Sequence, residues 1–145
     1  MIESLILAEK VIEIHDLILS TEEGLSGDYG PDRLEGALGR VTNKVVYEGM
    51  EDVFDIAAMY AVAIGRGHVF VDANKRTALV TALAYLSIQG IDIDRDEKLE
   101  DMMVDVAEGT LEHHEFSELL YSIYAGQVGE DFDTLEEDGA NEQSE

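Results

Sequence analysis

Residues 65–90 read GRGHVFVDANKRTALVTALAYLSIQG, a glycine-containing loop that leads into a long apolar segment. From Asn74 to Gly90 the segment is rich in alanine and leucine and carries no charge after Arg76, which predicts a helix buried in the centre of the fold. The uncharged run from Thr77 to Ile91 is shorter than the roughly 20 apolar residues that a membrane-spanning helix needs. We therefore expect a core helix of a soluble domain and no contact with a membrane.

The remaining sequence predicts further helices around this one. Apolar residues recur with a period of about 3.6 between Leu5 and Thr21, and Gly24, Gly27 and Gly30 interrupt the pattern after it. Further helices are expected at Pro31 to about Asn43, from a cap at Asp52 through Ile64, at about Asp96 to Glu108, and from a cap at Thr110 to Tyr124. The predicted fold class is all-α, a bundle of about six helices.

Two segments depart from this helical pattern. Three residues between Lys44 and Met50 favour extended structure: Val45, Val46 and Tyr47. We expect them to form a short flap or hairpin before the third helix. From Gln127 onward the chain is acidic and nearly free of apolar residues, so we expect disorder there. The predicted organisation is one folded domain over residues 1–126 and an acidic tail over 127–145.

The composition is strongly acidic, with 33 acidic residues against 9 basic ones and a net charge of -24. Repulsion on this scale opposes compactness in dilute salt and is tolerable near 1 M salt, where the Debye length falls to about 3 Å. We therefore expect the cytoplasm of a salt-rich cell; the alternative is an ordinary acidic protein with an acidic tail. Direct nucleic-acid binding is not expected, because it depends on neutralising phosphates with Lys and Arg.

The absence of cysteine excludes disulfides and thiolate metal sites and fits an intracellular location. The N-terminal residues Met1 to Ser4 lack the basic region of a signal peptide. Both features support the expected cytoplasmic location.

The scarce basic residues are concentrated between residues 66 and 76, which hold three of the nine: Arg66, Lys75 and Arg76. This window runs into the predicted helix N-terminus at Asn74, where unpaired N–H groups and a partial positive charge favour phosphate binding. Asp72 offers a hard oxygen ligand for Mg²⁺ bound to nucleotide phosphates. His68 can act as a general base, because histidine exchanges a proton near neutral pH. A base, a metal ligand and a phosphate clamp therefore converge in one window.

Each residue of this window also has an ordinary structural interpretation. A histidine after a helix is usually a surface or capping residue, an aspartate before a helix is usually an N-cap, and a Lys-Arg pair is usually solvated. The coincidence of all of them beside the scarce cations favours a functional site.

The other histidines are weaker candidates. His15-Asp16 resembles the metal-binding His-Asp pair of phosphohydrolases, but the additional spaced histidines of such sites are missing. His113 and His114 are adjacent on a predicted helix and point about 100° apart, so they are not expected to share a metal.

The segment His68-x-Phe70-x-Asp72-Ala73-Asn74-Lys75-Arg76 resembles the signature of death-on-curing (Doc) toxins, the kinase branch of the Fic superfamily. Four further segments are similar to residues of Doc-like proteins: Gly24-Leu25-Ser26-Gly27, Gly39-Arg40-Val41, Val46-Tyr47-Glu48 and Arg66-Gly67. The resemblance covers about residues 5–125 and implies a Fic-like helical bundle with catalytic activity.

Departures from the broader Fic signature favour one chemistry within the superfamily. Val69, Ala73 and Lys75 replace its proline and its two glycines, and Leu79 stands where adenylylating members carry a second arginine. In the superfamily that arginine grips the nucleotide for AMP transfer, whereas a lysine in the turn accompanies transfer of the γ-phosphate to a protein threonine. The resemblance therefore implies a kinase, with an adenylyltransferase or a catalytically silent interaction protein as the alternatives.

The resemblance also implies a role for each residue of the segment. His68 would take the proton of the target hydroxyl, Asp72 would bind Mg²⁺, and Asn74, Lys75 and Arg76 would hold the phosphates of ATP. Arg66 would either steer phosphate or pair with an acid. Phe70 would anchor the loop in the core, and the flap of Val45, Val46 and Tyr47 would align the target peptide by adding a strand.

The implied partners follow from the same family. The target would be a threonine of a Tu-like translation elongation factor, and its phosphorylation would arrest translation. The inhibitory motif (Ser/Thr)-x-x-x-Glu-(Gly/Asn) of self-restrained Fic proteins is missing from this chain. Restraint is therefore expected from an antitoxin polypeptide, whose short disordered segment would fold into a helix beside His68. The alternative is that the acidic tail after Gln127 folds back and sets its carboxylates against Lys75 and Arg76.

The charge balance leads to a first prediction. The melting temperature should rise steeply between low and molar KCl, because salt shortens the range over which exposed carboxylates repel one another. Calorimetry across a KCl series measures the effect, and a flat response would remove the argument for a salt-rich cytosol.

Overall fold

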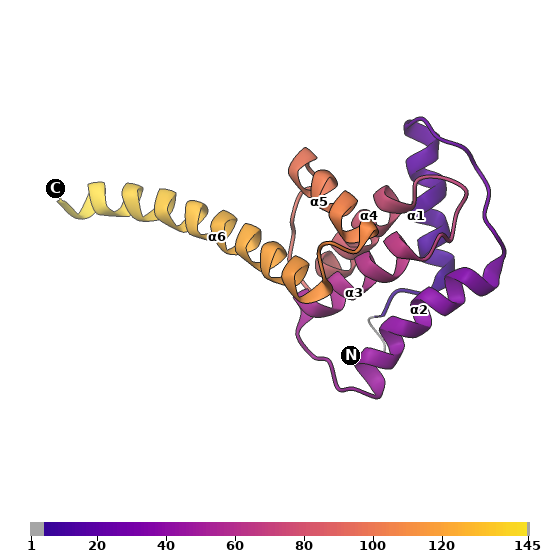
Figure 1. The fold of residues 1–145 in the computed structure, drawn as a ribbon. Helices are drawn as coiled ribbons and strands as arrows, with labels where there is room; N and C mark the ends of the chain where they lie inside the picture. The colour runs from indigo at the N-terminus through magenta and orange to yellow at the C-terminus, as the bar shows by residue number, and fades with distance from the viewer. Residues whose placement is uncertain (1–4, 145) are drawn as a thin grey trace.

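The computed structural model describes residues 5–144 of the chain and, from residue 130 on, only the backbone. It contains six helices: α1 (Ala8–Thr21), α2 (Pro31–Val46), α3 (Val53–Arg66), α4 (Asn74–Ile88), α5 (Glu97–Glu108) and α6 (His113–Ser144). Figure 1 shows α1 to α5 gathered into one body, from which the C-terminal part of α6 projects. The predicted all-α class is confirmed, and the predicted helix at residue 74 begins where expected.

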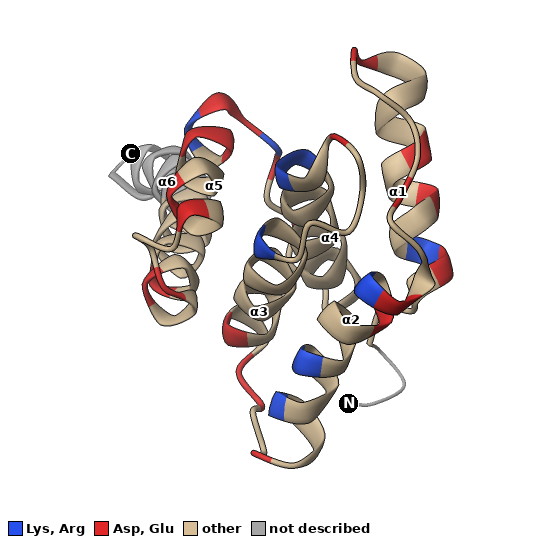
Figure 2. Cartoon of the chain, turned by 45° about the vertical axis from the view of Figure 1, so that its right-hand side comes forward, with Lys and Arg blue, Asp and Glu red and all other residues tan. Residues whose placement is uncertain are grey.

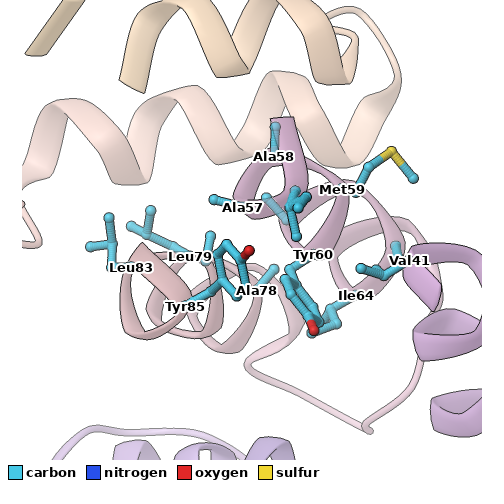
Figure 3. Close-up of a cluster of buried hydrophobic side chains, with 14 of the residues drawn as sticks. Val41, Ala57, Ala58, Met59, Tyr60, Ile64, Ala78, Leu79, Leu83 and Tyr85 are labelled. Carbon is cyan, nitrogen blue, oxygen red and sulfur yellow. The ribbon is translucent and has the colours of Figure 1, made fainter. Parts of the chain in front are cut away.

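Helix α3 forms the centre of the body, because it is apolar on nearly every face. It packs against α2, α4, α5 and α6, and every residue from Ile56 to Ala61 is buried. Its alanines, among them Ala57, Ala58 and Ala61, let the neighbouring helices approach closely. Figure 3 shows the resulting core, in which side chains of α2, α3 and α4 meet. The loop between α3 and α4 is thereby fixed at both ends by buried helices.

The N-terminal segment is attached to this core by one buried hydrogen bond. The backbone N–H of Ile6 donates to the hydroxyl oxygen of Tyr60 on α3 over 2.7 Å. The Tyr60 ring is 1% exposed and packs against Tyr85 of α4, with 5.5 Å between the ring centroids. Burial raises the pKa of Tyr60 to about 12, so its hydroxyl stays neutral.

The predicted flap is wrong. Val45 and Val46 form the last turn of α2, and Tyr47 follows it with 82% of its surface exposed. The helix continues past Asn43 because Val45 completes a buried stripe, and this burial outweighs the preference of valine for extended structure. The buried stripe comprises Leu34, Ala37, Val41 and Val45. A turn, closed by the N–H of Met50 donating to the carbonyl of Lys44 over 2.9 Å, replaces the hairpin.

The C-terminal segment also differs from the prediction. We expected disorder from Gln127, whereas α6 continues as a helix to Ser144. Extending an existing helix avoids the cost of nucleation, so a sequence with little apolar content can continue one. The division into a catalytic domain over 1–126 and a separate tail stays a prediction.

None of the helices in the described part of the chain combines the length and the apolar character that crossing a bilayer requires.

Removal of the Tyr60 hydroxyl provides a test of the core. Tyr60→Phe should lower the free energy of unfolding by about 1–3 kcal/mol, because it leaves the N–H of Ile6 buried without a partner. Tyr121→Phe is the matched control, since Tyr121 is exposed on α6 and its change should stay within about 0.5 kcal/mol. Urea unfolding of both variants measures the difference, and equal costs would contradict the assigned bond.

Candidate active site

The loop between α3 and α4 is held by the side chain of Asn74. Its Oδ1 accepts a hydrogen bond from the N–H of Phe70 over 2.9 Å, and its Nδ2 donates to the carbonyl of Phe70 over 2.8 Å. The Phe70 ring is 2% exposed and lies in the core beside the buried Val69. Asn74 therefore shapes the loop, and its predicted role in binding a phosphate stays a prediction.

Two residues of this loop have left-handed backbone conformations, His68 with φ 46° and Ala73 with φ 65°. Such conformations cost about 1–2 kcal/mol each for a residue with a Cβ atom. Arg33 supports the first of them, because its Nη1 donates to the carbonyl of His68 over 3.0 Å. The same guanidinium lies over the ring of Tyr29, 4.7 Å from its centroid. The His68 side chain remains exposed to solvent.

The first turn of α4 is unusual in its charge. Ala73 occupies the N-cap position and offers no side-chain oxygen to the N–H groups of the turn. The turn contains no acidic residue, whereas the first turns of the other five helices contain Glu9, Asp32, Asp55, Glu97 and Glu115, respectively. A helix start that has unpaired N–H groups and no acid favours an external anion.

A cavity of about 400 Å³ lies against this helix start. Its lining includes five of the predicted site residues: His68, Asp72, Asn74, Lys75 and Arg76. Gly65 of α3 and Ala107 and Glu108 of α5 contribute to the opposite side. A larger cavity of about 500 Å³, between the start of α3 and α6, contains none of the predicted residues. The smaller cavity is therefore the candidate active site.

The Asp72 carboxylate is fixed by two backbone groups. Oδ2 accepts from the N–H of Leu25 over 3.0 Å, and Oδ1 accepts from the N–H of Ala73 over 2.7 Å. These bonds, with a smaller contribution from Arg76, lower the pKa of Asp72, so the carboxylate is ionised at neutral pH. No cluster of three or more His, Cys, Asp or Glu in the described residues could hold a metal ion alone. A single carboxylate fits Mg²⁺ that keeps its waters and shares ligands with nucleotide phosphates.

A chain of ion pairs positions Arg76 at the same cavity. Its Nη1 donates to the carbonyl of Glu23 over 2.8 Å and lies 3.5 Å from the carboxylate of Glu22. Arg95 binds both oxygens of Glu22, at 2.7 and 2.9 Å, and also binds Glu100 at 2.6 Å. The hydrogen bonds from Arg95 lower the pKa of Glu22 and keep it charged. Sequence reasoning missed Glu22 and Arg95, which lie far apart in the chain.

Lys75 is exposed and forms no ion pair with any side chain that the structure describes. Arg33, Arg40 and Lys98 also lack an ion pair among the described side chains, but of these four cations only Lys75 lines the cavity. Figure 2 shows Lys and Arg on α2, at the end of α3 and at the start of α4, whereas Asp and Glu dominate α5. Lys75 is therefore available to an anion that enters the cavity.

Two sets of predicted site residues lie away from the cavity. Arg66 donates to the carbonyls of Val106 and Leu111, over 2.7 and 2.9 Å, and lies 3.7 Å from Glu112. Of the two roles considered for Arg66, the geometry supports pairing with an acid and corrects the phosphate-binding role, because its donors tie α3 to the α5–α6 connection. The residues of the expected flap, Val45 to Tyr47, do not line the cavity either.

The glycine-rich loop after α1 helps to position the candidate active site, a role that the sequence analysis does not predict. It pairs with the loop between α3 and α4 in a short antiparallel bridge, in which the N–H of Val71 donates to Gly27 over 3.0 Å and the N–H of Tyr29 donates to Val69 over 3.2 Å. A Cβ atom at Gly24 would lie 2.5 Å from Cδ2 of Leu19, 3.0 Å from Nη2 of Arg76 and 3.1 Å from Oδ2 of Asp72. Glycines at these positions are a sequence signal that the backbone approaches other groups closely.

Comparison with known proteins is consistent with this site. The model of the Fic/DOC family matches residues 5–86, which include the whole loop and the start of α4. "Protein kinase doc" of Escherichia phage P1 is 40% identical over 116 residues, which cover 80% of this chain and 92% of that protein. "Toxin Doc" of Mycolicibacterium smegmatis is 35% identical over 85 residues, which cover 55% of this chain and 63% of that protein. The chain belongs to the Fic/Doc family, as the resemblance of residues 68–76 implied.

The close approach at Gly24 can be tested directly. Gly24→Ala should reduce activity by up to about 100-fold, because the added methyl group, besides pushing against Leu19, displaces the Asp72 carboxylate and the Arg76 guanidinium. Gly30→Ala is the matched control: Gly30 also has a positive φ, of 103°, but a Cβ atom there meets nothing within 4 Å. Both variants should lose about 1 kcal/mol of stability or more from backbone strain. Equal activity of the two variants, after correction for folded protein, would contradict the assigned contact.

Proposed function

We propose that the chain is the toxin of a toxin–antitoxin pair and a protein kinase that transfers the γ-phosphate of ATP to a hydroxyl of a target protein. The observation that carries the proposal is the cavity in which His68, the fixed Asp72 carboxylate and the unpaired Lys75 surround the uncapped start of α4. The printed names of the two relatives, a protein kinase and a toxin, support the same conclusion.

The proposed reaction uses the groups of this cavity in distinct roles. The oxygen of the target hydroxyl forms a bond to the γ-phosphorus while the bond to the bridging oxygen of ADP breaks, and His68 accepts the hydroxyl proton. Lys75, Arg76 and the N–H groups of α4 bind the phosphate oxygens and stabilise their charge in the transition state. Mg²⁺, when bound at Asp72, would neutralise further phosphate charge. Asn74 contributes by holding the loop that carries His68 and Asp72.

The proposed target is a threonine of a Tu-like elongation factor, whose phosphorylation would arrest translation in the cytoplasm. This part rests on the resemblance to Doc toxins, and so does an antitoxin polypeptide that inhibits in trans. Location in a salt-rich cytosol stays a prediction.

Transfer of AMP is the second candidate function, and the position of Leu79 argues against it. Leu79 is fully buried on α4, so it supplies no charge to the nucleotide at the position of the second arginine of adenylylating members. A catalytically silent interaction protein is disfavoured because Lys75 and the ionised Asp72 line an open cavity.

Labelled nucleotides distinguish these functions. Incubation with elongation factor Tu and ATP labelled at the γ position should transfer label, whereas ATP labelled at the α position should not. His68→Ala and Asp72→Ala should each reduce transfer, by about 100-fold or more for loss of the general base, with the fold retained. His114→Ala, at an exposed histidine of α6, is the control and should keep full activity. Transfer of the α label would establish AMP transfer, and full activity of His68→Ala would exclude the assigned mechanism.

A further inference from the structure

His15 of α1 lies directly beneath the loop that carries the site. Its side chain is 2% exposed, and its ring stacks on the ring of Phe70 with 3.8 Å between centroids and an angle of 9° between the planes. Neighbouring residues of α1, Ile14 and Ile18, pack against Ala73 at the other end of the loop. The buried face of α1 therefore supports the whole length of the loop between Phe70 and Ala73.

Both ring nitrogens of His15 are engaged. Nε2 lies 3.0 Å from the carbonyl oxygen of Asp72, and because a carbonyl only accepts, Nε2 carries the hydrogen and donates it. Nδ1 lies 3.2 Å from Oδ1 of Asp16, whose side chain is largely exposed. The bond from Nε2 and the stacking on Phe70 fix the rotation of the ring, so the position of the Asp72 carbonyl is tied to α1.

This contact acts on the residue whose carboxylate lines the cavity. The backbone of Asp72 is held from one side by His15, while its carboxylate accepts hydrogen bonds from Leu25 and Ala73. Contacts from α1, from the loop after α1 and from the neighbouring Ala73 thus determine where the two carboxylate oxygens lie. Groups that hydrogen-bond to a metal-binding residue fix its orientation, and their loss typically lowers the metal affinity by about 10- to 100-fold.

We propose that His15 is a positioning residue for phosphoryl transfer, which sets the affinity of the site for Mg²⁺ by holding the main chain of Asp72. The proposal rests on the proposed function in one respect, namely that Asp72 binds Mg²⁺. His15 itself touches neither substrate nor metal and acts only through Asp72 and Phe70.

Two substitutions separate the parts played by the ring and by its donor. His15→Phe keeps a flat ring over Phe70 but removes the hydrogen bond to Asp72, whereas His15→Gln keeps an N–H donor and loses the stacking. In His15→Phe the Mg²⁺ concentration for half-maximal transfer should rise by about 10-fold or more. The kcat at saturating Mg²⁺ and the KM for the target should change little. His15→Gln should recover most of the Mg²⁺ affinity, and His114→Phe is the control at an exposed histidine.

A spectroscopic measurement on the unmodified protein makes the test independent of catalysis and of the folding of the variants. In NMR spectra of protein that carries ¹⁵N-labelled histidine, the Nε2 hydrogen of His15 should exchange slowly with solvent. The resonance of this N–H group should shift when Mg²⁺ is added in the presence of ADP. The His114 signals should not move.

The outcomes are distinct. An unchanged Mg²⁺ requirement in a folded His15→Phe variant, or a His15 signal that ignores Mg²⁺ and ADP, would overturn the proposal. A responsive His15 signal in a protein that transfers no γ-phosphate would support the coupling of His15 to the site and refute the proposed function instead.

Discussion

The carboxamide of Asn74 bonds to both the N–H and the carbonyl of Phe70, and the rest of the site depends on this clamp. The clamp forces the chain to turn back on itself immediately before α4. With Phe70 buried by that turn, His68 and Asp72 are carried on the outer side of the loop, beside the first N–H groups of α4. The strained backbone at His68 and Ala73 is tolerated because contacts from other segments hold the loop in place.

Charge constrains the molecule as strongly as packing does. A chain with a net charge of -24 repels a polyphosphate, so attraction has to be provided locally. Lys75 is left without an acidic partner among the described side chains, and the first turn of α4 is free of acids. Arg76 differs from Lys75, because Glu22, itself bound by Arg95, holds the Arg76 guanidinium in one orientation. One cation is therefore unpaired and one is held by ion pairs at the same helix start.

The sequence predicted those parts of the fold that depend on local pattern. The start of α4, the cap at Asp52 and the all-α class all follow from short stretches of residues, and they are confirmed. The prediction of a flap is wrong because burial of Val45 in the core decides its conformation, and burial depends on residues elsewhere in the chain. The role of Arg66 was open for the same reason, since its partners are backbone carbonyls of α5 and its connection to α6. The contacts of His15, Glu22 and Arg95 are long-range pairings that no local pattern indicates.

The ion chain through Arg95 links the site to the order in which the chain is synthesised. Residues 68–76 leave the ribosome well before Arg95 and Glu100, which orient Glu22 and through it Arg76. The opposite side of the cavity, formed by Ala107 and Glu108, follows later still. A nascent chain that already contains the whole loop thus lacks both the fixed arginine and one side of the cavity. The candidate active site is completed only after α5 has folded onto the helices that precede it.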